Sequence, residues 1–138
     1  MPYEFLENTD GVTLRASGAT PEELFSESLR GMLARMEPRI FHNNDAEADR
    51  VIEISAPDRA ALLVDFLGAV LRLALENSEL YEEVYFAELT ETKLAARLYG
   101  REVNQFDREI KAVTAGGAGV RQNVAGVWET EIIFAAVG

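Results

Sequence analysis

The feature that most constrains the fold is one long apolar segment, AALLVDFLGAVLRLALEN, at residues 60–77. Its apolar residues recur with helical spacing and cover more than half of a helical circumference, which predicts a helix buried by the rest of the chain. These positions are Leu62, Leu63, Phe66, Leu67, Val70, Leu71, Leu73 and Ala74. Asp65 and Arg72 interrupt the segment, so we expect a core helix and not a membrane span. Asp58 predicts the N-cap of a helix over residues 58–77.

A capping box predicts a second helix. Thr20 precedes Pro21, and Glu23 lies three residues after Thr20, a pattern that marks the first turn of a helix. An apolar stripe follows at helical spacing and Pro38 ends the segment, so we expect the helix over residues 21–36. The stripe consists of Leu24, Phe25, Ser28, Leu29, Met32, Leu33 and Met36. The polar residues outside the stripe are Glu22, Glu27 and Arg30.

Most of the remaining chain has the alternating, β-branched or aromatic composition of strands. Residues 2–7 and 11–17 flank the turn Asn8-Thr9-Asp10-Gly11 and predict a hairpin. Further strands are predicted over residues 50–56, 84–91, 93–100, 108–115, 118–124 and 127–137. Without a linker or an internal repeat, the pattern predicts one α+β domain over residues 1–138. Two helices are expected to pack against a mixed or antiparallel sheet.

The predicted strand in REIKAVTAGG carries a lysine among apolar neighbours and ends in glycines. Residues 116–119 are glycine-rich, but a strand and not a helix follows them, so a hairpin loop is expected there and not a phosphate-binding loop. Strict alternation assigns two faces to the strand, with Ile110, Ala112 and Thr114 on one and Lys111 and Val113 on the other.

The net charge of −11, from 24 acidic and 13 basic residues, restricts the partners of the chain. This charge repels phosphate backbones and no basic cluster reverses it, so direct nucleic-acid binding is not expected. A basic protein partner or a cation fits better, unless the acidity serves solubility alone. The absence of cysteine excludes disulfides and thiolate metal sites. The start of the chain lacks a signal-peptide pattern, so we expect a soluble cytoplasmic protein that is not bound to a membrane.

Few residues have the spacing of a catalytic site. The chain contains one histidine, His42, and no serine in a nucleophile elbow, so a serine–histidine triad is not supported. The acidic residues 82–83, and Asp45 with Glu47 and Asp49, could bind a hard cation. They lack the spacing of an EF-hand, however, and are expected to be solvated. We therefore expect no enzymatic activity.

Three segments together resemble the archease family of small acidic proteins, and the resemblance spans nearly the whole chain. The opening YEFLENTDGVTLRASGATPEELF is similar to the family's Phe-Leu-Asp-His-Thr-Ala-Asp turn, strand and Thr-x-Glu-Glu helix start. The segment ALLVDFLGAVLRL resembles the family's Leu-Leu-x-Asp-Trp-Leu helix, with Asp65 at the aspartate position. EIKAVT matches the family's Glu-Val-Lys-Ala-Val-Thr almost letter for letter.

The resemblance implies an archease-like α+β fold and the role of an accessory protein. Archeases assist RtcB-type tRNA-splicing RNA ligases by promoting guanylation of the ligase and multiple turnovers. In the family this activity is linked to a site for calcium or another divalent metal. One ligand is the aspartate of the Thr-Ala-Asp turn, a second follows phenylalanine near the C-terminus, and histidines lie near the Lys-Ala-Val-Thr strand.

This sequence departs from the family metal site. Gly11 replaces the first aspartate and Ala135 replaces the second. Asp10 lies one residue early, so only a local shift of the turn could bring its carboxylate to a metal. The family histidines and their aromatic neighbour correspond to Asn8, Asn104 and Ala115-Gly116. A hard cation requires several oxygen ligands, so we expect no metal cofactor beyond weak binding through Asp10.

Two functions remain open from the sequence, while a third, an enzyme that uses Asp10, Asp65 or Glu109, is not supported because no acid–base cluster appears elsewhere. The chain is an archease-like accessory protein for an RtcB-type ligase, or a diverged paralogue that binds proteins or itself without activating a ligase. The candidate partner-binding cleft comprises Asp10, Asp65, Asn104, Glu109 and Lys111. Lys111 either packs its stem on a sheet while its ammonium reaches water, or lines the cleft with Glu109. Asp65 is a polar-face residue or a hydrogen-bond anchor for a loop, and the oligomeric state is not indicated.

Overall fold

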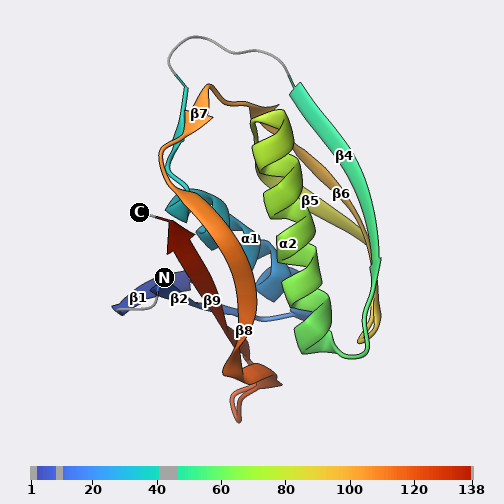
Figure 1. The fold of residues 1–138 in the computed structure, drawn as a ribbon. Helices are drawn as coiled ribbons and strands as arrows, with labels where there is room; N and C mark the ends of the chain where they lie inside the picture. The colour runs from blue at the N-terminus through green and yellow to red at the C-terminus, as the bar shows by residue number, and fades with distance from the viewer. Residues whose placement is uncertain (1–2, 9–10, 41–46, 138) are drawn as a thin grey trace.

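A computed structural model describes residues 3–8, 11–40 and 47–137. In this part of the chain, two helices lie between two antiparallel sheets (Figure 1). The four-stranded sheet has the order β1 (Tyr3–Asn8), β2 (Gly11–Gly18), β9 (Trp128–Val137) and β8 (Glu109–Gln122). The three-stranded sheet has the order β4 (Glu47–Ser55), β6 (Lys93–Glu102) and β5 (Glu79–Leu89). A short pair consists of β3 (Pro38–Arg39) and β7 (Gln105–Phe106).

The expected α+β class is confirmed, and so is the hairpin of β1 with β2. The sequence suggested one sheet, but the strands form separate antiparallel sheets. Both helices have apolar side chains on more than one side, and each helix contacts the four-stranded and the three-stranded sheet. No helix in the described residues is long and apolar enough to cross a membrane.

α2 (Arg59–Asn77) lies at the centre of the core, as the long apolar segment predicted. The Oδ1 atom of Asp58 accepts a hydrogen bond from the backbone N–H of Ala61 at 2.8 Å and caps the first turn. Ser78 ends the helix in the left-handed region, at a φ of 53°. The helix contacts β8 of one sheet, all three strands of the other sheet, and α1. Its broad apolar arc is therefore the consequence of packing on several sides.

α1 (Pro21–Arg35) begins at the predicted capping box and also contacts both sheets. The Thr20 hydroxyl oxygen accepts a hydrogen bond from the backbone N–H of Glu23 at 3.1 Å. Glu27 lies outside the apolar stripe, yet it is only 8% exposed, a burial that the stripe did not predict. Its carboxylate accepts a hydrogen bond from Arg30 at 2.9 Å, which supplies the partner that a buried charge requires.

The prediction of a hairpin loop at residues 116–119 is wrong. β8 continues through these residues to Gln122, and they form a wide irregularity in the strand, opposite Glu131 of β9. The turn into β9 follows at Asn123, whose side-chain oxygen accepts hydrogen bonds from two backbone N–H groups, and at Gly126, which has a φ of 86°. An asparagine and a glycine thus supply the turn, while the earlier glycines permit a bulge.

Lys111 is the extra residue of a second bulge in β8. Ile110 and Ala112 pair with consecutive residues of β9, which leaves Lys111 without a partner in the ladder. The bulge breaks the alternation, so Ile110 and Val113 both pack on the core while Lys111 and Ala112 are exposed. The prediction that Ile110 and Ala112 share one face is therefore wrong.

A buried polar network connects the two edge strands of the three-stranded sheet. Arg50 of β4 donates two hydrogen bonds of 2.9 Å to Glu79 of β5, and the Tyr81 hydroxyl donates a third at 2.7 Å. Glu79 is only 5% exposed. The hydrogen bonds from Arg50 hold the pKa of Glu79 below its usual value in spite of its burial. Burial and the neighbouring carboxylate raise the pKa of Tyr81.

We expect the substitution Glu79→Gln to lower the free energy of unfolding by about 2 kcal/mol, because it weakens hydrogen bonds to a buried carboxylate. The folded-state pKa of Glu79 is depressed, so its stabilising effect is present above the unfolded-state value near 4.5 and is lost as the pH falls through the folded-state value. Denaturant unfolding of both proteins, from neutral pH to about pH 3, should show their difference shrinking. A difference that stays constant with pH would contradict this role.

Candidate functional site

A groove of about 790 Å³ opens over the exposed side of α2 and is lined by residues of β4, α2 and the start of β8. We call it the α2 groove. Figure 1 shows α2 running between β4 and β8. Among the described residues β4 pairs only with β6 and β8 only with β9, so each presents an unpaired strand edge. Gly68 and Ala69 of α2 line the groove, and a Cβ added to Gly68 would meet no atom within 4 Å. Small residues on the uncovered side of α2 therefore leave the space open.

Five charged side chains line the α2 groove, and all of them are exposed: Glu53, Asp65, Arg72, Glu109 and Lys111. None makes a hydrogen bond or an ion pair with another described residue. The contrast with the rest of the described chain is clear for arginine. Nine arginines form ion pairs with carboxylates and Arg59 lies 4.9 Å from the ring centre of Trp128, whereas Arg72 has neither kind of partner.

Three of the five predicted cleft residues come together in this groove. Asp65 comes from α2, and Glu109 and Lys111 come from the start of β8. Asn104 does not line the groove; its backbone N–H donates a hydrogen bond to the carbonyl of Arg39 at 2.8 Å, beside the short β3–β7 pair. Asp10 lies outside the described residues.

Asp65 is exposed and has no hydrogen-bond partner among the described residues, so it is a polar-face residue and not the anchor of a described loop. Sequence reasoning did not assign Glu53 and Arg72 to the cleft. Arg72 carried a signal, because it lies seven residues after Asp65 on the polar side of the same helix. For Glu53 the only sequence signal was the alternation of its strand. Alternation predicts which face of the sheet a residue lies on, but not which element packs beside it.

At the two positions where the resemblance implies metal-binding aspartates, this chain has Gly11 and Ala135, and neither has a carboxylate. Gly11 has a φ of 150°, and a Cβ placed on it would lie 2.3 Å from the carbonyl oxygen of Phe134. An aspartate at this position would therefore require the backbone to move. Ala135 follows Phe134 in β9 and offers no ligand. The described residues contain no group of three or more histidine, cysteine or acidic residues placed to hold a metal.

The model of the archease protein family matches residues 3–135, nearly the whole chain. The chain belongs to the archease family. The archease of Methanosarcina mazei is 27% identical over 139 residues, covering 95% of this chain and 93% of that protein. The archease of Methanosarcina barkeri is 26% identical over 139 residues, with the same coverage.

Two solved structures share the fold of this archease family member. The solution structure of Methanobacterium thermoautotrophicum protein 1598 has a TM-score of 0.72 at 21% identity and covers 99% of both chains. The crystal structure of an archease from Thermotoga maritima, described as a possible chaperone, has a TM-score of 0.65 at 18% identity and covers 94% of both chains. The two-helix, multi-sheet arrangement is thus the family's fold.

Gly11 and Gly68 differ in the space available for a side chain, and substitution by alanine tests this difference. We expect Gly11→Ala to lower the free energy of unfolding by about 2 kcal/mol, because its Cβ meets backbone atoms and its φ is positive. Gly68→Ala, at an open helical position, should raise the free energy of unfolding by about 0.5–1 kcal/mol. Thermal and denaturant unfolding measure both, and a neutral Gly11→Ala would contradict the tight packing of the β1–β2 hairpin on β9.

We expect calorimetric titration of the protein with calcium or manganese to give no heat of specific binding, because Gly11 and Ala135 supply no carboxylate. Unfolding temperatures with and without each metal give an independent readout, since a ligand that binds the folded state raises them. Saturable heat with one equivalent of metal would contradict the loss of the site.

Proposed function

We propose that this protein is a non-enzymatic accessory protein of the cytoplasm that binds an RtcB-type RNA ligase and promotes its guanylation and turnover without a metal of its own. Membership of the archease family along nearly the whole chain supports this role. The description of the Thermotoga maritima archease as a possible chaperone agrees with a protein partner. The observation that carries the proposal is the α2 groove, where Glu109 and Lys111 of the family segment EIKAVT lie with Asp65, exposed and unpaired.

Unpaired charges at an open groove suit the recognition of a protein. An ion pair that already exists in the free protein must be rearranged before its members can bind a partner. The charged groups of the α2 groove have no described partner and are free to form new pairs, which raise the association rate and fix the orientation of a complex. The strand edges beside them offer backbone N–H and C=O groups to an extended segment of the partner.

The buried polar side chains of the described chain have partners within the fold. Buried Glu27 and Glu79 are each paired with an arginine. The buried hydroxyls of Ser28 and Thr130 donate hydrogen bonds to the backbone carbonyls of Leu24 and Gly119. These groups stabilise the fold and are not available to a partner, whereas the exposed charges of the α2 groove are.

A second candidate is a diverged paralogue that binds proteins without activating a ligase. The replacement of two metal aspartates by Gly11 and Ala135 favours it, because the resemblance links those positions to activation. The two candidates make the same use of the groove and differ only in the response of the ligase.

The decisive measurement adds the protein to the RtcB-type ligase of the same organism. We expect a larger guanylated fraction and more ligation events per ligase. Lys111→Ala should weaken the apparent affinity for the ligase by about fivefold, the effect of one lost ion pair of about 1 kcal/mol. Lys93→Ala is the matched control, because it removes the other lysine of the chain from an exposed position outside the groove.

Each outcome separates the candidates. Stimulation that Lys111→Ala reduces and Lys93→Ala preserves supports ligase activation through the α2 groove. Binding without stimulation favours the paralogue. Stimulation that Lys111→Ala does not reduce would show that the ligase contacts this protein outside the α2 groove.

A further inference from the structure

Exposed apolar side chains gather on the outer face of the three-stranded sheet, the face turned away from the helices. Val51 is 67% exposed, Tyr85 is 65% exposed and Tyr99 is 39% exposed, and they are three of the seven exposed large apolar residues described. The strand register sets two neighbouring rows across the sheet, one of Val51, Arg97 and Tyr85 and the next of Asp49, Tyr99 and Glu83. We call these rows, with the hollow described below, the sheet patch.

The centre of the sheet patch is held in a fixed arrangement. Arg97 donates hydrogen bonds of 2.8 and 3.0 Å to the two carboxylate oxygens of Asp49. Its guanidinium carbon lies 5.7 Å from the centre of the Tyr99 ring. Arginine and tyrosine at the centre of a patch, with apolar neighbours, are typical of the side chains that contribute most to protein interfaces.

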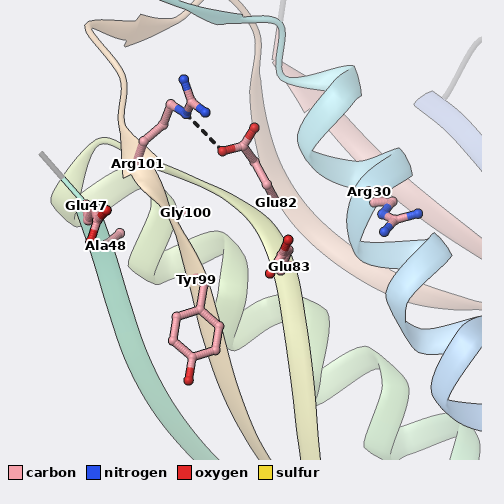
Figure 2. Close-up of a pocket in the computed structure, with 8 residues that line it drawn as sticks. All are labelled: Arg30, Glu47, Ala48, Glu82, Glu83, Tyr99, Gly100 and Arg101. Atoms are coloured by element: carbon pink, nitrogen blue, oxygen red, sulfur yellow. Dashed lines mark hydrogen bonds and ion pairs between the residues drawn. The ribbon is translucent and has the colours of Figure 1, made fainter. Parts of the chain in front are cut away.

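A hollow of about 680 Å³ lies beside this centre (Figure 2). Gly100 lines it, and a Cβ on Gly100 would lie 1.8 Å from the carbonyl oxygen of Leu80, so a larger residue would require the backbone to move. A bulge in β5 leaves Glu82 outside the ladder, and Glu82 and Glu83 are both exposed. Figure 2 shows Glu82 directed at Arg101, with which it forms an ion pair of 2.9 Å.

Two carboxylates of the hollow remain without a described partner. Glu47 projects from β4 and Glu83 from β5, on either side of β6 (Figure 2). Arg30 of α1 also lines the hollow and is paired with Glu27. Because Arg97 and Arg101 are paired with carboxylates as well, the unbalanced charge of the sheet patch is that of Glu47 and Glu83. The patch is therefore an apolar and aromatic surface with a negative hollow at one end.

We propose that the sheet patch is a docking surface, distinct from the α2 groove, for a basic surface of the ligase, with a lysine or arginine side chain entering the hollow between Glu47 and Glu83. The identity of the partner rests on the proposed function. An RNA ligase holds phosphate backbones, and basic side chains are what binds them, so such an enzyme presents the complementary charge. A protein with a net charge of −11 is attracted to that surface, and the aromatic centre supplies the contact area.

The test measures binding of the purified protein to the immobilised RtcB-type ligase of the same organism, together with stimulation of ligation. The double substitution Glu47→Lys and Glu83→Lys should weaken binding at least tenfold, and Tyr85→Ala about tenfold. The matched control is Glu76→Lys with Glu91→Lys, which makes the same charge change at exposed, unpaired positions outside the patch and should leave binding within about twofold. Rising salt should weaken the wild type more than the double variant. Unfolding temperatures confirm that each variant is folded.

The outcomes distinguish the inference from the function on which it rests. Weakened binding by both patch variants, with an unaffected control, supports the docking surface. Wild-type binding and stimulation that both patch variants retain would overturn the docking surface and leave the proposed function intact. A wild-type protein that neither binds nor stimulates the ligase would overturn both. Equal losses in patch and control variants would show that net charge alone, and not this patch, governs binding, and would also overturn the inference.

Discussion

The burial of α2 is the constraint on which the rest of the structure depends. A 19-residue helix with apolar side chains around more than half of its circumference cannot be covered by one sheet, so it is packed by β8, by the three-stranded sheet and by α1. The same helix keeps β4 and β8 apart, since each lies on one of its sides. The open strip that remains, with Gly68 and Ala69, becomes the α2 groove. The α2 groove is thus a consequence of how the core is closed.

Local sequence signals were sufficient to predict the helices. They were insufficient to predict strand irregularities, which depend on the neighbouring strand. Both helices and their caps at Thr20 and Asp58 could be predicted, because capping and helical periodicity involve residues a few positions apart. The two bulges in β8 could not be predicted, because a bulge is defined by the count of residues on the opposite strand. The resulting errors were the face of Ala112 and the position of the hairpin turn.

The candidate site was predictable in part for the same reason. The family resemblance and the polar side of the core helix predicted Asp65, Glu109 and Lys111 as cleft residues. Arg72 shares the polar side of the helix with Asp65, but its place in the groove and that of Glu53 depend on which elements pack beside them, a property of the folded chain. Asn104 corresponds to a family position in sequence, yet it lies outside the groove because the chain turns toward β3 and β7 before β8 begins.

The segment EIKAVT explains how a fold can persist when ligands are replaced. Ile110 and Val113 fill the core and Lys111 forms the bulge between them, so the segment is needed for packing whether or not a metal is bound. Gly11 and Ala135 contribute no core side chain, and the hairpin can close against Phe134 because Gly11 lacks a Cβ. The residues that pack the sheet are therefore different from Gly11 and Ala135, the positions where the resemblance implies metal ligands. A chain that lost the ligands would keep its surfaces, and recognition of a partner is the part of an accessory function that surfaces alone can sustain.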